Sequence, residues 1–110
     1  MSAGRYGFSP TAGGTLTFLG SSGGATRQAI PGLGPNILVT NGTGANPIDG
    51  SVAFIRMGDV TVAATVNDLP IQRGGKIMLA RDPTSQTYAS VIMAGTSGTV
   101  YVTAGDGGIL

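Results

Sequence analysis

The sequence predicts an all-β domain, and three observations support this prediction. Short runs of alternating apolar and polar residues recur along the chain, as expected of strands that bury one side. Glycine, proline, aspartate or asparagine bounds each run. The 110 residues include 20 glycines and 6 prolines, and all five acidic residues are aspartates. Because glycine and proline disfavour helices and glutamate is missing, the composition argues against an α-helical fold. The length corresponds to one domain with one core.

The first 36 residues are expected to form a Gly/Pro-rich N-terminal arm and loops with one short strand, TLTFL at 15–19. Glycine pairs and the segment PGLGP at 31–35 interrupt the apolar residues of this region. Ordering glycine costs more backbone entropy than ordering any other residue. We therefore expect the arm to become ordered against a partner.

The β-sandwich body is expected over 37–110, where strand patterns follow one another at short intervals. Their spacing is typical of an antiparallel sandwich or barrel. Turns are predicted at Gly58-Asp59, at Asp82-Pro83 and at 95–98, and an Asn-Gly hairpin at 41–42. The expected strands are NILVT at 36–40, SVAFIRM at 51–57, VTVAATV at 60–66, KIMLA at 76–80, QTYASVIM at 86–93 and TVYVT at 99–103.

The sequence lacks the residues on which most catalytic and metal sites depend. It has no histidine and no cysteine, which excludes the usual zinc, haem, thiol and Ser–His sites. No two aspartates lie within three residues of each other, and neither the EF-hand nor the P-loop spacing is present. Nothing selects a pair of carboxylates for hydrolysis. We therefore expect no enzyme, no cofactor and no metal.

The segment VNDLPIQRGGKIML at 66–79 places three ionisable groups close together in the sequence: Asp68, Arg73 and Lys76. Such a group is compatible with an active site or with a solvated corner between strands. Without a histidine, a cysteine or a second nearby acid, the corner is the favoured interpretation. Pro70 is expected to lie in the connection, and Gly74-Gly75 to turn the chain into the strand that begins at Lys76.

Charge and hydropathy give no reason to expect nucleic acid or a membrane as a partner. The net charge is +1, and the six cations are dispersed along the chain. We see no signal peptide and no apolar stretch long enough to span a bilayer, and expect a soluble chain. Only 10% of the residues are charged, against roughly 25% in an average domain, which suits a protein docked in an assembly.

Partner contacts are expected at two places. Arg5, Tyr6 and Phe8 combine a cation with aromatic side chains, the residue types that anchor interfaces. We expect the two rings to dock into a hydrophobic pocket of a partner. Arg73 and Lys76 are the other candidate partner-contact residues.

Six motifs follow one another in the second and third thirds of the chain, each built around strand ends and turns. They are VTN at 39–41, AFIRMG at 53–58, VAAT at 62–65, DLPI at 68–71 with Gly74, YASVI at 88–92, and GTVYVT at 98–103 with Gly105 and Gly107. In this order they resemble the outline of small virion proteins of tailed bacteriophages, the capsid decoration, cement or staple proteins. The resemblance covers 37–107, about two-thirds of the chain.

This resemblance implies a jelly-roll-like sandwich of about seven to eight short strands. It also implies a non-enzymatic virion structural protein that binds the outside of a phage capsid and stabilises contacts between major capsid subunits. The expected location is the capsid exterior, the expected partner is the major capsid protein, and the expected state is a homo-oligomer, a dimer or a trimer. One alternative is a head-fibre base or tail component. Another is a carbohydrate-binding adhesion module, although the chain has no tryptophan and only three tyrosines.

Overall fold

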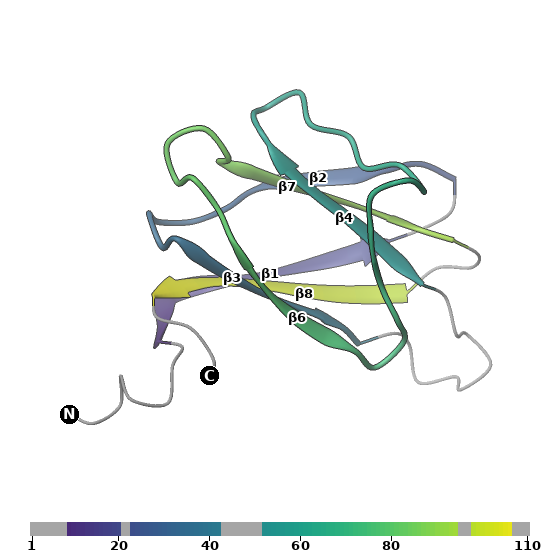
Figure 1. Cartoon of the computed structure of the whole chain (residues 1–110), viewed down its shortest axis with the longest axis horizontal. Helices are drawn as coiled ribbons and strands as arrows, with labels where there is room; N and C mark the ends of the chain where they lie inside the picture. Colours follow the sequence, from purple (N-terminus) through teal and green to yellow (C-terminus); the bar gives the residue numbers. More distant parts are fainter. Residues whose placement is uncertain (1–8, 21–22, 43–51, 95–97, 107–110) are drawn as a thin grey trace.

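The computed structural model describes residues 9–20, 23–42, 52–94 and 98–106, and these residues form an all-β sandwich (Figure 1). Eight strands build two four-stranded antiparallel sheets, and no helix occurs in the described ranges. The predicted fold class is therefore confirmed. The strands are β1 (Ser9–Gly20), β2 (Thr26–Ala29), β3 (Asn36–Asn41), β4 (Ala53–Gly58), β5 (Leu69–Ile71), β6 (Lys76–Ala80), β7 (Tyr88–Met93) and β8 (Gly98–Asp106).

The strand order identifies the sandwich as a jelly roll. One sheet has the order β1-β8-β3-β6 and the other β2-β7-β4-β5. The pairs β1–β8, β2–β7, β3–β6 and β4–β5 are those of one long antiparallel ribbon folded in its middle. Further pairing of β3 with β8 and of β4 with β7 rolls this ribbon into two sheets. Eight strands in two facing sheets with these crossings form the double-sheet jelly roll.

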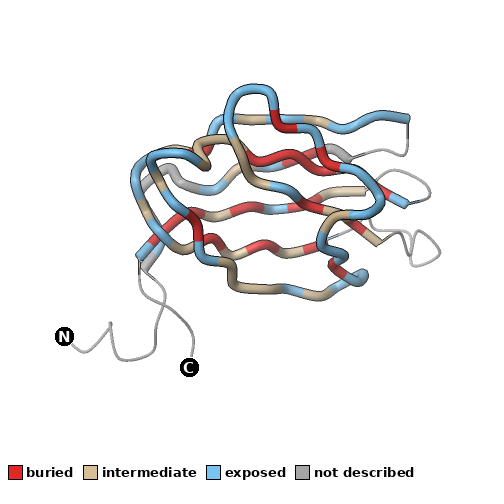
Figure 2. The backbone as a smooth tube through the Cα atoms, turned by 45° about the horizontal axis from the view of Figure 1, so that its top comes forward, coloured by how far each residue is buried: buried red, intermediate tan, exposed pale blue. Residues whose placement is uncertain are grey.

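The core lies between the two sheets, and its buried residues come from β1, β3, β4, β5, β7 and β8 and from Ile30, which follows β2. Figure 2 colours the buried positions along the chain red. Burial alternates with a period of two along β3, as expected for a strand with one face on the core. Phe18 is the largest of the fully buried side chains. The core also contains Ile30, Ile37, Val39, Ala53, Ile55, Ile71, Ala89, Val91, Met93, Val100, Val102 and Ala104.

The first 36 residues contribute two strands, not the single short strand that was expected. β1 runs the length of β8, from the pair Ser9–Asp106 to the pair Gly20–Gly98. β2 adds to the other sheet beside β7. The register of β1 shifts between Pro10 and Thr15, the stretch that contains Gly13 and Gly14, and Phe18 still reaches the core.

The strand predicted at 60–66 is absent. Val62 and Ala64 are buried and Val60 is 55% exposed, so alternation is present without any strand pairing. The Gly58-Asp59 turn consequently joins no hairpin. Asp59 accepts a hydrogen bond from the Thr61 N–H (2.8 Å), and its carbonyl accepts one from the Val62 N–H (3.0 Å).

Two other connections differ from their predictions. Residues 69–71, expected as a connection around Pro70, form the edge strand β5. The Asn-Gly hairpin at 41–42 does not occur, because β3 and β4 belong to different sheets. The turn at Asp82 is confirmed by the hydrogen bond from the Gln86 N–H to the Asp82 carbonyl (2.8 Å). The turn predicted at 95–98 lies largely outside the described residues. No helix in the described ranges has the length and apolarity needed to span a membrane.

Candidate functional site

The outer face of the β2-β7-β4-β5 sheet is covered by the chain itself, over residues 59–68. The Ala64 N–H donates to Oγ of Ser90 on β7 (2.9 Å), and both residues are buried. Arg27 on β2 donates to the Val62 carbonyl (3.3 Å), and Arg56 on β4 pairs with Asp68 (3.3 Å). One polar or ionic contact from each of three neighbouring strands therefore holds this covering segment in place.

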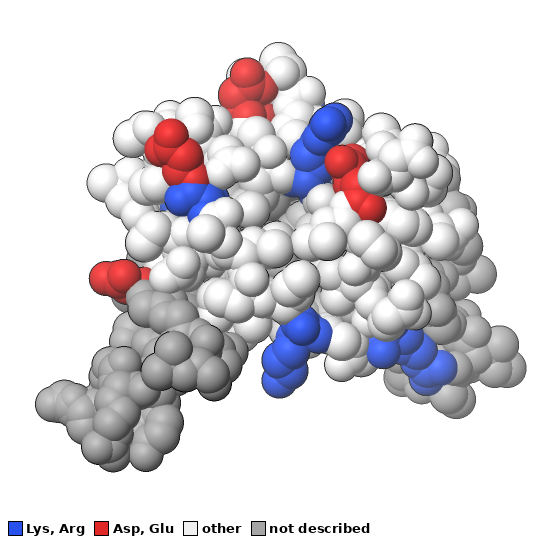
Figure 3. Space-filling model, in the orientation of Figure 1, with Lys and Arg blue, Asp and Glu red and all other residues white. Residues whose placement is uncertain are grey.

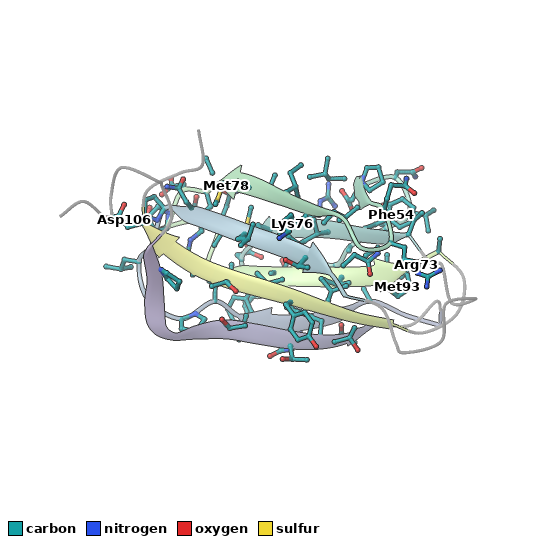
Figure 4. The ribbon with its side chains drawn as sticks, turned by 90° about the horizontal axis from the view of Figure 1, so that it is seen from below. Phe54, Arg73, Lys76, Met78, Met93 and Asp106 are labelled. Atoms are coloured by element: carbon teal, nitrogen blue, oxygen red, sulfur yellow. The ribbon has the colours of Figure 1, made fainter. Side chains whose placement is uncertain are left out.

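The outer face of the β1-β8-β3-β6 sheet has no such cover among the described residues, and we call it the open face. Figure 4 looks onto this sheet and labels Lys76 and Met78 on β6. Lys76 is the single charged side chain in the set that the strand registers place on this face. Its members are Thr15, Thr17, Asn36, Leu38, Thr40, Lys76, Met78, Ala80, Thr99, Tyr101 and Thr103.

Tyr101 stands near the middle of the open face and is 42% exposed. It lies on β8, between Thr17 of β1 and Thr40 of β3. A Cβ atom at Gly42 would come within 2.7 Å of Cε2 of Tyr101, so only the missing side chain of Gly42 leaves room for the ring. The ring therefore lies close to the backbone of Gly42.

Threonines surround this ring and give the open face hydrogen-bonding capacity without charge. The Oγ1 atoms of Thr15 and Thr103 lie 3.1 Å apart, which ties β1 to β8 on the outside of the sheet. Leu38 and Met78 continue the same cross-strand row as Thr103. A partly apolar face with an exposed tyrosine and a single charged side chain, Lys76, has the composition of the central part of a protein interface.

The ionisable groups of 66–79 do not converge on one site. Asp68 faces Arg56 on the covered side of the molecule, and it also accepts from the Thr65 N–H (2.7 Å). Lys76 lies on the open face, on the other sheet. Arg73 lies between them in the turn from β5 to β6, where Gly74 has a φ of 71° and the Gly75 N–H donates to the Gln72 carbonyl (2.8 Å). The predicted turn at Gly74-Gly75 is confirmed.

Of the other candidate partner-contact residues, Arg5, Tyr6 and Phe8 lie outside the described residues. Tyr101 was not singled out from the sequence. The strand pattern predicts that the Tyr101 side chain points outward. It does not predict which of the two sheets is covered by residues 59–68.

A buried arginine, also missed in the sequence, organises one end of the sandwich. Arg81 donates to the carbonyls of Gly34 (2.7 Å), Gln86 (3.0 Å) and Gly32 (3.1 Å). Desolvation by burial lowers the pKa of its guanidinium. The bonds to Gly32 and Gly34 hold the PGLGP loop, on which Leu33 is 74% exposed. The role of Arg81 is structural, since all three acceptors are backbone carbonyls.

Charged groups are sparse on the face shown in Figure 3, and some acidic and basic side chains lie next to each other there. Within the described ranges, no three acidic side chains gather in a way that would hold a metal ion.

The comparisons with known proteins concern the fold alone. No family model and no curated protein matches the chain. Among solved structures, the hydroxypropylphosphonic acid epoxidase from S. wedmorenis in complex with fosfomycin is 11% identical with a TM-score of 0.45, and the match covers 82% of this chain and 41% of that one. The Drosophila NLP core, whose structure concerns pentamer formation and histone binding, is 12% identical with a TM-score of 0.40, over 83% of this chain and 95% of that one. Both likenesses are too low to support an argument about what this chain does.

Proposed function

We propose that the chain is a non-enzymatic structural protein of a bacteriophage virion. In this proposal it binds the outside of the capsid and stabilises contacts between major capsid subunits. The support comes from the motifs at 37–107, which resemble capsid decoration proteins, and from the sparse charge of the chain. A jelly roll supplies a rigid body that adds contact area between larger subunits.

The observation that carries the proposal is the difference between the two outer faces. The chain uses its own residues 59–68 to cover one sheet and leaves the other bare among the described residues. An open face with Tyr101 at its middle and only Lys76 charged suits a large protein surface better than a small polar ligand. The occupant that we propose for it is the outer surface of the major capsid protein.

The test compares capsids that lack this chain with the same capsids after the purified chain is added back. Added chain should bind in proportion to the major capsid protein and raise the temperature at which the capsid ruptures. Equal rupture temperatures, or no stoichiometric binding, would refute the proposal. A few copies per particle, located at the tail or a fibre, would favour the tail-component alternative. Binding on a glycan array without capsid binding would favour the adhesion alternative.

Two tyrosine variants locate the contact. Tyr101→Ala should weaken capsid binding about thirtyfold, because a central aromatic anchor contributes about 2 kcal/mol. Tyr88→Ala is the matched control, since Tyr88 lies on β7, in the sheet that residues 59–68 cover. Equal losses for the two variants would show that the open face is not the contact.

A further inference from the structure

The four edge strands of the sandwich differ in how far they are protected against pairing with another chain. β5 has only three residues with Pro70 at its centre, and β2 has four residues with the exposed Arg27. β1 carries a register shift between Pro10 and Thr15. Proline, charge, short length and irregularity are the usual means of blocking an edge. β6 has none of them apart from Lys76 at its first residue.

The backbone of β6 presents hydrogen-bonding groups at this edge. Two hydrogen bonds at the ends of the β3–β6 pair show which residues of this region bond to β3. The Arg81 N–H donates to the Pro35 carbonyl (2.8 Å), and the Asn41 N–H donates to the Gly75 carbonyl (2.9 Å). Because antiparallel pairs alternate, Ile77 and Leu79 direct their amides and carbonyls toward β3. Those of Lys76, Met78 and Ala80 are directed away from β3, and no described strand pairs with them.

The core is incompletely closed along the same edge. Ile77 and Leu79 point inward but are only half-buried, unlike the fully buried Ile37 and Val39 opposite them on β3. Leu69 on β5, from which the chain crosses to β6, is 38% exposed. A second strand beside β6 would cover apolar surface as well as satisfy the backbone groups.

We propose that the occupant of this edge is a second copy of the chain, with the two β6 strands antiparallel about a twofold axis at Met78. In this register each Met78 faces its counterpart, and each Lys76 faces Ala80 of the second copy. This antiparallel register places the two Lys76 ammonium groups at opposite ends of the pair, whereas a parallel pair would place them side by side. The proposal does not depend on capsid binding.

The decisive experiment uses cross-linking, because the chain has no cysteine and one substitution supplies its only thiol. Met78→Cys should form a disulfide-linked dimer about tenfold faster than Thr103→Cys, since only the former meets its own counterpart across the axis. Thr103 is the matched control because it lies on the same open face, on the interior strand β8. Equal rates for the two variants would overturn the proposal.

A second measurement follows the unmodified interaction. Sedimentation equilibrium of the intact purified chain should show a dimer, and Met78→Lys should raise its dissociation constant about tenfold by opposing two ammonium groups. Thr103→Lys should leave the dimer unchanged, and circular dichroism should show both variants folded. A monomer at all concentrations would overturn the proposal, even if the edge binds an extended segment of another protein.

Discussion

Individual polar residues hold the irregular parts of this molecule in place. Asp59 and Asp82 each begin a turn and accept hydrogen bonds from a threonine two residues later. Hydrogen bonds from the Thr61 side chain and N–H lower the pKa of Asp59, and those from the Thr84 side chain and N–H lower the pKa of Asp82. Both carboxylates thus serve the local backbone.

The lowered pKa values predict how stability depends on pH. A carboxyl whose pKa is lower in the folded state stabilises the fold above its unfolded pKa of about 3.9, and this contribution is lost as the pH falls through the folded value. The thermal midpoint should therefore be flat near neutral pH and fall below about pH 4. Asp82→Asn should reduce the size of this fall, as measured by circular dichroism. An identical acid profile for the variant would contradict the assignment.

At the scale of elements, period-two patterning predicted six of the eight strands, at least in part. It missed β2 because TRQA is short and polar, and β5 because Pro70 marks a connection as readily as an edge. It also predicted a strand at 60–66 that is absent. Alternation reports only that one side of a segment is buried. A segment with one buried side can pair as a strand within a sheet, or it can pack across the outer face of a sheet without pairing. Which of the two occurs depends on residues that are distant in sequence.

The covering segment should depend on the buried hydrogen bond from Ala64 to Ser90. Ser90→Ala removes the acceptor and leaves the Ala64 N–H buried without it, which should cost about 1–3 kcal/mol in the free energy of unfolding. Hydrogen exchange should show faster exchange of the Ala64 amide and little change at Val39 in the core. Urea denaturation measures the stability loss.

The matched control for this prediction is Thr17→Ala. Thr17 is exposed on β1, at the open face, so its side chain should contribute little to stability. If Ser90→Ala were as mild as this control, the covering segment would be held by Val62 packing and the Arg56–Asp68 pair instead.

For the molecule as a whole, composition and spacing were enough to predict an all-β sandwich. The candidate site was predictable only in part. Lys76 was among the predicted contact residues and lies on the open face, whereas Tyr101 was missed. Among the described residues, which outer face is left uncovered depends on where residues 59–68 pack, and this is a property of the three-dimensional arrangement. No local pattern encodes it.

The nested strand pairing has a kinetic consequence. β4 and β5 are the closest pair along the chain, while β1 and β8 are the most distant, joining Ser9 to Asp106. Closing the longest loop costs the most entropy, so we expect β1 to dock last and folding to take milliseconds to seconds. Until then β8 exposes one edge of the run TVYVT, which is prone to intermolecular pairing. Stopped-flow circular dichroism at increasing protein concentration should show refolding yields that fall as concentration rises. A concentration-independent yield with microsecond refolding would contradict this order of events.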